Sequence, residues 1–238
     1  MKMSMPTQDF TKALKACRVA CNGREVQSRP HLAGVWFRAL PGGGVHAWAT
    51  NGHWLAVVRL PQAQIETPGV AQISASDISR VLATAPKGNN GGPTTLTLTG
   101  RVLRIDFGTA LTAVEVRMTE MQPVPIQDVV PKGKSTKKHE RRAINIDLIR
   151  DALDGIDAMS TTKRGKAAKF YPMGPTANDP VIIWSPQARD YFALLMPMRD
   201  DSKRDMAWWN AHAEELVAMK VAADAAKAPA EPAHAAAQ

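Results

Sequence analysis

The run Tyr191-Phe192-Ala193-Leu194-Leu195-Met196-Pro197-Met198-Arg199 decides the fold, together with Ala49-Thr50-Asn51-Gly52-His53-Trp54-Leu55-Ala56 far upstream. The later run is apolar, stops at a proline and ends on a charge, which is typical of a buried strand. The earlier run places an Asn-Gly turn signal between two apolar stretches and predicts a hairpin. Taken alone, the two runs also fit ordinary core strands with a surface histidine.

Both runs resemble the bacterial DNA polymerase III β sliding clamp family. Chains of that family end close to Tyr-x-x-x-Met-Pro-Met-Arg, and their middle domain carries a segment close to Ala-Thr-Asp-Gly-His-Arg-Leu-Ala. Here Arg29–Val35 stands where the family has Arg-x-x-Leu-x-Gly, and Val129-Val130-Pro131 stands where the family closes its middle domain. The resemblance implies a clamp-like protein that recruits partners on DNA, and not an enzyme.

In the family, the two runs build a pocket that docks polymerase peptides, and the resemblance carries this expectation over. Implied site residues are Leu32, Thr50, Gly52, His53, Trp54 and Leu55 on one wall, Leu194, Leu195, Met196, Pro197, Met198 and Arg199 on the other, and Pro123 and Val129 at the boundary. Methionines suit a surface that accepts several partners, because the unbranched thioether repacks easily. Trp54 stands where the family has arginine, so this rim differs from the family pattern.

Composition limits the class of protein. The chain has 238 residues, of which 45% are hydrophobic, enough for one large domain or two small ones. It has no apolar run of about 18 residues and no signal-peptide core, so we expect no membrane span and a cytoplasmic location. Cys17 and Cys21 are four residues apart on an expected helix and suit neither a structural disulfide nor a zinc site. We expect no metal and no cofactor.

The formal net charge is +8, and basic residues cluster. Counterion release lets such clusters bind nucleic acid without reading its sequence, although plain solvated faces are the alternative. The predicted DNA contacts are Lys12, Lys15, Arg18, Arg24, Arg29, Arg80, Lys87, Lys137 and Lys138. The helix expected after residue 144 does not fit this role, because Asp147, Asp151 and Asp154 form an acidic stripe on it.

Hydrophobic periodicity predicts an α+β, DNA-clamp-like fold of antiparallel sheets with helices on one face. Helices are expected over 10–20, 77–85 and 145–159, and strands over 32–39, 45–50, 54–60, 72–74, 96–98, 102–105, 111–118, 169–173, 181–184 and 191–196. The first strands and helices form two similar halves of one clamp domain. The expected divisions are a full clamp domain at 1–130, a basic linker at 131–143, an abbreviated clamp domain at 144–200, and a helical extension with an Ala/Pro-rich tail at 201–238.

No nucleophile, phosphate-loop or metalloprotease pattern is present in the sequence. Two functions are favoured over a third, an unrelated enzyme on an α+β scaffold. One is a processivity or recruitment factor, a ring-forming homo-oligomer that encircles double-stranded DNA, tethers a DNA polymerase or another protein with a clamp-binding motif, and is served by a clamp loader. The other is a non-encircling clamp-like adaptor or decoy that binds the same peptides. The short second domain, the acidic stripe and the C-terminal extension, which carries Trp208 and Trp209, favour the adaptor. The intact first helix and the overall basicity favour the processivity factor.

Overall fold

The computed structural model describes residues 1–21, 29–40, 44–87, 92–108, 113–118, 123, 143–162, 166–176 and 178–198. Its helices are α1 (Thr7–Arg18), α3 (Ala75–Thr84) and α5 (Ile146–Met159), with 3-10 turns η1 (Val19–Cys21) and η2 (Pro30–Leu32). Its strands are β1 (Lys2–Met5), β2 (Gly34–Ala39), β3 (Val45–Thr50), β4 (Trp54–Leu60), β5 (Gln64–Thr67), β6 (Gly69–Ser74), β7 (Thr94–Thr99), β8 (Val102–Asp106), β9 (Ala113–Arg117), β10 (Lys169–Pro172), β11 (Val181–Trp184) and β12 (Tyr191–Leu195). None of the helices in these ranges is long and apolar enough to cross a membrane.

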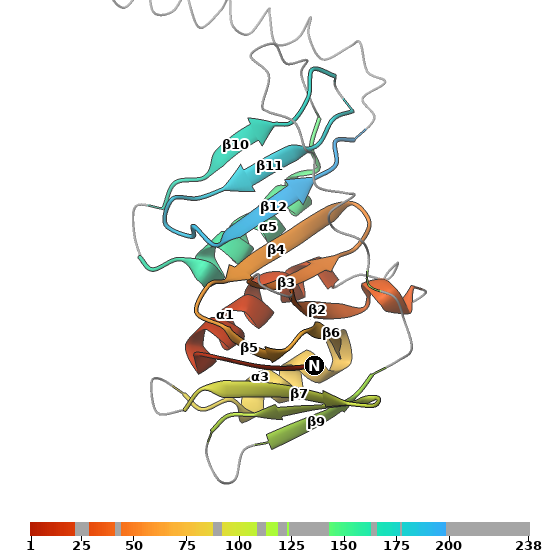
Figure 1. Ribbon diagram of the computed structural model, residues 1–238. Helices are drawn as coiled ribbons and strands as arrows, with labels where there is room; N and C mark the ends of the chain where they lie inside the picture. The colour runs from red at the N-terminus through yellow and green to blue at the C-terminus, as the bar shows by residue number, and fades with distance from the viewer. Residues whose placement is uncertain are drawn as a thin grey trace, which may run out of the picture. The chain divides into compact units, whose positions relative to one another are not determined.

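A seven-stranded antiparallel sheet forms the main layer, in the order β10-β11-β12-β4-β3-β2-β6. Figure 1 shows these strands side by side, with α1 and α5 behind the same face. The antiparallel pair β12–β4 connects the early and late parts of the chain in this sheet. In this pair Leu194 lies opposite Leu55, and Tyr191 lies opposite Val58. One sheet therefore runs through both segments that the sequence assigns to separate domains.

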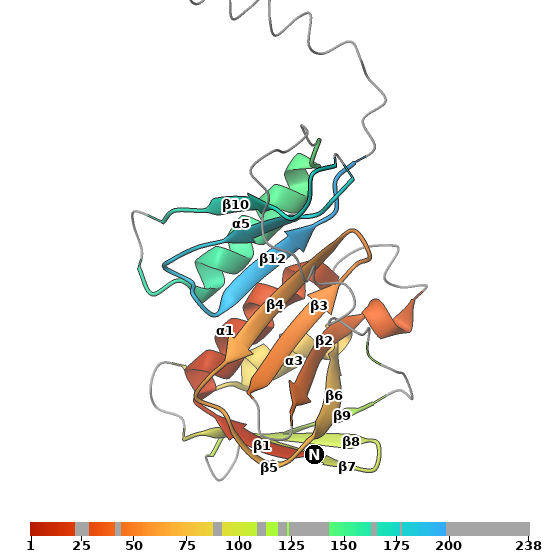
Figure 2. The same cartoon turned by 45° about the horizontal axis from the view of Figure 1, so that its top comes forward.

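A second antiparallel sheet, in the order β5-β1-β7-β8-β9, lies at the other end of this body (Figure 2). The first part of the chain repeats one order of elements, β1, α1 and β2–β4 followed by β6, α3 and β7–β9, and β5 is an additional strand between the two repeats. Each repeat gives its first strand to the other repeat: β1 pairs with β7, and β6 pairs with β2. Within the described residues, α5 and β10–β12 follow the same order of one helix and three strands.

Local sequence explains where the helices begin. Ser74 precedes α3, and its hydroxyl accepts the Asp77 N–H at 3.2 Å. Asn145 precedes α5, and its Oδ1 accepts the Asp147 N–H at 2.8 Å. Such side-chain caps satisfy backbone donors that the first turn leaves without a partner. The third helix, α1, follows Pro6 and has no side-chain cap, so its buried stripe, which includes Phe10 and Leu14, holds it in place.

Strand alternation divides the apolar residues of the large sheet between its two faces. The helix-side core contains Phe37, Trp54, Tyr191 and Leu195. A smaller cluster on the opposite face, here called the outer face, consists of Trp36, Trp48, Leu55, Val57 and Leu194. Trp36 and Trp48 stack there with their ring centroids 6.3 Å apart. The turn η2 lies over this cluster, since Trp36 Nε1 donates to the His31 carbonyl at 2.9 Å.

Close packing fixes α5 against β12. Gly155 faces the fully buried Tyr191 ring, and a Cβ on Gly155 would lie 2.1 Å from the tyrosine hydroxyl oxygen. That hydroxyl donates to the Ala152 carbonyl at 3.3 Å. Only glycine allows this approach, so the helix and the strand that bears the Met-Pro-Met segment are positioned together.

The predicted fold class, α+β with a clamp-like arrangement, is confirmed. Two strands, β1 and β5, were not predicted. The divisions at 130, 143 and 200 remain predictions. The expected helix over 206–221, with Trp208 and Trp209, lies outside the described residues.

Candidate functional site

The turn between β3 and β4 is built by its own side chains. Asn51 Oδ1 accepts the backbone N–H of His53 at 2.9 Å and that of Trp54 at 3.1 Å. Thr50 Oγ1 donates to the Trp54 carbonyl at 2.7 Å and accepts the Gly52 N–H at 3.1 Å. Gly52 has a φ of 92°, which residues with a Cβ rarely adopt. The turn is therefore rigid, and it holds Gly52 and His53 exposed at the sheet's end.

The segment after β12 lies against this turn. Met196 N–H donates to the His53 carbonyl at 3.0 Å, and Met198 N–H donates to the Ala143 carbonyl at 2.8 Å. The two methionine side chains are 42% and 54% exposed, although the backbone that carries them is held on both sides. A fixed backbone with adaptable apolar side chains is suited to binding apolar anchors of a peptide. The run that contains Gly52 and His53 and the run that contains Met196 and Met198 are therefore in contact.

The structure separates the predicted docking residues into two groups. Thr50, Gly52, His53, Leu55, Leu194, Met196, Pro197 and Met198 lie together at the outer face or the turn beside it. Leu55 and Leu194 are buried within the outer-face cluster, 3% and 1% exposed, so the exposed members of this group are Gly52, His53, Met196 and Met198. The prediction was wrong for Trp54 and Leu195. They lie opposite each other in the β4–β12 pair and point into the helix-side core, where they are 1% and 0% exposed. Successive residues of a strand face opposite sides, so these two cannot contact a ligand on the outer face.

The other predicted docking residues are placed as follows. Leu32 is buried at the end of η2, and Pro123 is half-buried. Val129 and Arg199 lie outside the described residues. Two residues that help to build the docking site were not predicted. Asn51 holds the turn together, and the Asn-Gly turn signal could have indicated it. Ala143 pairs with Met198, and this pairing has no sequence signal.

A cationic hollow of about 400 Å³ lies between α1 and α3. Among the residues that line it, Lys12, Lys15 and Lys87 supply the charge, and Thr7, Thr11 and Gln8 supply polar groups. Lys15 and Lys87 are exposed, and Lys12 is half-buried. Lysines gathered around one hollow attract phosphate groups regardless of base sequence. Arg18, another predicted DNA contact, is exposed in the last turn of α1.

Two predicted DNA contacts are placed elsewhere. Arg80 pairs with Asp77 at 2.6 Å and donates to the Glu115 carbonyl of β9 at 3.1 Å, so its guanidinium covers a strand edge. Arg29 Nη1 lies 3.9 Å from where a Cβ of Gly52 would be, next to the docking turn and away from the lysine hollow. The remaining predicted contacts Arg24, Lys137 and Lys138 lie outside the described residues.

The acidic stripe on α5 is real. Asp147 and Asp154 are exposed, and Asp147 pairs with Arg150 at 3.0 Å. Burial raises the pKa of Asp151 above the ordinary aspartate value, and the neighbouring Asp154 and Asp147 raise it further. α5 therefore presents negative charge beside α1, which presents positive charge.

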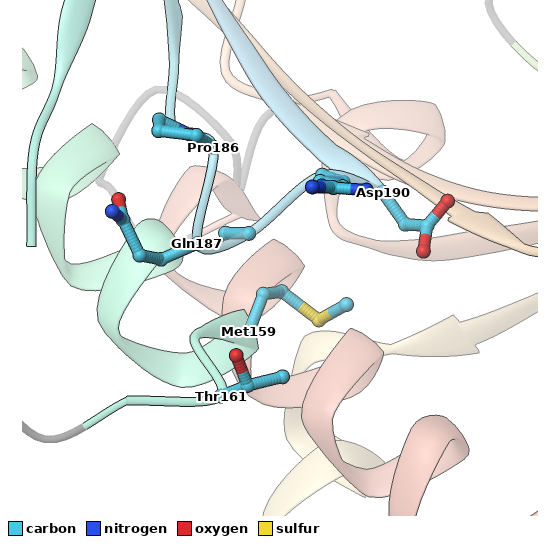
Figure 3. Close-up of a pocket in the computed structure, with 7 residues that line it drawn as sticks. Met159, Thr161, Pro186, Gln187 and Asp190 are labelled. Atoms are coloured by element: carbon cyan, nitrogen blue, oxygen red, sulfur yellow. The ribbon is translucent and has the colours of Figure 1, made fainter.

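A second hollow, of about 390 Å³, lies where α5 ends beside the turn between β11 and β12 (Figure 3). It is lined by Met159, Thr161, Pro186, Gln187, Ala188, Arg189 and Asp190. Gln187 is engaged within the turn, since its Oε1 accepts from Ser185 Oγ at 2.9 Å and its backbone carbonyl accepts the Thr161 N–H at 3.3 Å. No group of three metal-binding side chains occurs in the described ranges.

Comparison of the sequence with protein families finds no match, and comparison with curated proteins finds none either. Solved structures do match. The DNA polymerase III subunit beta of Pseudomonas aeruginosa superposes with a TM-score of 0.64 at 15% identity, over 84% of this chain and 67% of that one. The beta subunit of Thermotoga maritima gives 0.65 at 14% identity over 84% and 66%, and that of Borrelia burgdorferi gives 0.65 at 11% over 83% and 64%.

The chain has the fold of a DNA polymerase sliding clamp. Identities of 11–15% establish the fold alone. The chain spans about two thirds of the length of these clamp chains, 64–67% in the three cases.

Proposed function

We propose that this protein is a clamp-type recruitment factor for DNA replication, which docks polymerase-type peptides and binds double-stranded DNA without sequence specificity. The observation that carries the proposal is the joining of the Met196–Met198 segment to the turn at Gly52 and His53. These segments are far apart in sequence, and their contact creates an exposed apolar surface beside rigid backbone. Such a protein acts by raising the effective concentration of its partner on DNA, with no bond chemistry.

The docking surface is tested by calorimetry with a short peptide that contains a glutamine and spaced leucine and phenylalanine anchors. Wild-type protein should bind it with a Kd at or below about 100 μM. Met196→Asp should abolish binding, because a carboxylate would then be desolvated under the peptide. Val102→Asp is the matched control: Val102 is 39% exposed on β8 of the other sheet, outside the docking surface. Absence of wild-type binding, or equal loss in both variants, contradicts the docking proposal.

Duplex binding is proposed to use the lysine hollow between α1 and α3. Simultaneous replacement of Lys12, Lys15 and Lys87 by glutamine should weaken binding equally for all duplex sequences. Each lost phosphate contact should also lower the salt slope of log K by about 0.9. A binding constant that does not depend on salt, or a triple variant with an unchanged slope, contradicts this placement.

A second candidate is the non-encircling adaptor, and the strand edges favour it. Arg80 occupies the Glu115 carbonyl on the outer edge of β9. At the other sheet's edge, β10 is four residues long and includes Pro172, which has no N–H to donate. Neither of these two edges is well suited to extend its sheet into another copy; β5 and β6 are the edge strands on the opposite sides of the two sheets. Sedimentation velocity at micromolar concentration decides: a stable ring-sized oligomer supports encirclement, and a monomer that retains peptide binding supports the adaptor.

A further inference from the structure

Three basic side chains form one row across adjacent strands of the large sheet. Arg38 on β2 is opposite His46 on β3, and His46 is opposite Arg59 on β4. Residues directly opposite each other in an antiparallel pair project from the same face with Cβ atoms about 4.5–5.5 Å apart. The row lies on the outer face, because Trp36, Trp48 and Val57, two positions along the same strands, belong to the outer-face cluster. It is thus separate from the lysine hollow on the helix side.

At neutral pH the charge of this row comes from Arg38 and Arg59, which lie on either side of His46. The pKa of His46 is lowered, first by burial and then by the charges of Arg59 and Arg38. At the β6 end the row stops at the apolar Val70, and at the β12 end Arg59 N–H donates to the Asp190 carbonyl at 2.7 Å. Asp190 itself lines the hollow of Figure 3. An anion bound over the row would lie between the two arginines.

Aromatic side chains occupy the next row on the same face. Trp48, Val57, Phe192 and Trp184 follow one another across β3, β4, β12 and β11. Trp48 is buried, but Phe192 and Trp184 are partly exposed, and Lys169 Nζ lies 5.9 Å from the centre of the Trp184 ring. Phe192 is the diagonal neighbour of Arg59 in the β4–β12 pair, a placement that puts Cβ atoms about 7–8 Å apart. Ring and charge are therefore close enough to act on one ligand.

We propose that the outer face binds single-stranded nucleic acid, with phosphates over Arg38, His46 and Arg59 and bases against Phe192 and Trp184. A cationic track beside aromatic rings is how proteins hold single strands without reading their sequence, since each base offers a face for stacking. An acidic peptide would use the cations and leave the rings without a role, so the aromatic row favours nucleic acid. The site does not depend on peptide docking or on duplex binding at the lysine hollow.

The test is fluorescence anisotropy of a labelled oligothymidylate with the full chain at low salt, together with quenching of tryptophan emission. Wild-type protein should bind the oligothymidylate more tightly than an abasic strand of equal length, and more tightly than polyglutamate. Arg59→Glu should weaken binding about tenfold or more, as expected when a phosphate contact is lost and reversed. Trp184→Leu should reduce the quenching and the preference for thymidylate over the abasic strand.

Arg117→Glu is the control, because Arg117 is exposed on β9 of the other sheet and the charge change is the same. It should leave oligothymidylate binding within about twofold. Arg59→Gln, with thermal melts of all variants, separates a binding loss from unfolding. Equal losses in Arg59→Glu and Arg117→Glu, no advantage over the abasic strand, tighter binding of polyglutamate, or no binding at all would each overturn the proposal. A negative result for oligothymidylate binding would not change the outcome of the Met196 peptide experiment or of the lysine duplex experiment. The single-strand proposal and the proposed function can therefore be refuted independently.

Discussion

Gly155→Ala is expected to destabilise the protein, even though alanine is the better helix former. Alanine in a helix interior is favoured over glycine by about 1 kcal/mol. Against this, the new Cβ would lie 2.1 Å from the Tyr191 hydroxyl oxygen and 2.4 Å from its Cζ. The ring is fully buried and cannot swing away, so α5 must move off β12. Overpacking of this kind costs typically about 1–3 kcal/mol, and we take its upper end.

The net loss should be about 2 kcal/mol, which lowers Tm by roughly 4–8 °C for a domain of this size. Urea denaturation and thermal melts measure it. Tyr191→Phe removes the hydroxyl oxygen, which is the atom nearest to the new Cβ, and loses only the 3.3 Å hydrogen bond to Ala152. In the Tyr191→Phe protein, Gly155→Ala should therefore lower the free energy of unfolding by at least about 0.5 kcal/mol less than it does in wild type. Gly44→Ala is the control, since a Cβ there meets nothing within 4 Å. If Gly155→Ala is as stable as wild type, or costs the same in both backgrounds, the clash argument is wrong.

Four smaller predictions test other contacts. Ser74→Ala should cost about 1 kcal/mol in the free energy of unfolding, because α3 loses its cap. Gly34→Ala should cost about 1–3 kcal/mol, because the Cβ would lie 2.4 Å from the Ile73 carbonyl oxygen and separate β2 from β6. Because the pKa of His46 is lowered in the folded protein, the unfolded chain takes up a proton at a higher pH, and the free energy of unfolding should fall as pH drops below about 6.5. His46→Gln should make thermal stability depend less on pH in this range, as measured by melts across pH. Arg80→Ala should change stability by less than about 1 kcal/mol but increase self-association in sedimentation, because a strand edge is uncovered.

Much of the fold follows from local sequence. The helices α1, α3 and α5 have regular apolar stripes, and the central strands are apolar runs bounded by turn residues, so periodicity locates them. The strand β5 could not be found in this way, because its residues are almost all exposed and polar and it is ordered by pairing with β1. β1 is short, and its pairing partners lie far along the chain.

The candidate site was partly predictable for the same reason. The family resemblance selected the two runs that meet, and the turn chemistry at Asn51-Gly52 is readable from sequence. Which side each residue faces depends on strand register, and this put Trp54 and Leu195 in the core. Charge alone could not show that Arg80 is used within the fold, or that Arg38, His46 and Arg59 align across three strands.

The pairing of β4 with β12 also has a consequence for the newborn chain. The edge of β4, with Leu55 and Val57 beside it, is completed only when β12 arrives roughly 130 residues later, an interval of roughly 7–26 s at translation rates of about 5–20 residues per second. During that time the ribosome-bound nascent chain presents an unpaired apolar strand, and long-range pairings of this kind form slowly. We expect the yield of folded protein in cells to depend strongly on holding chaperones and on the temperature during synthesis. The stability of the finished molecule should depend on them less.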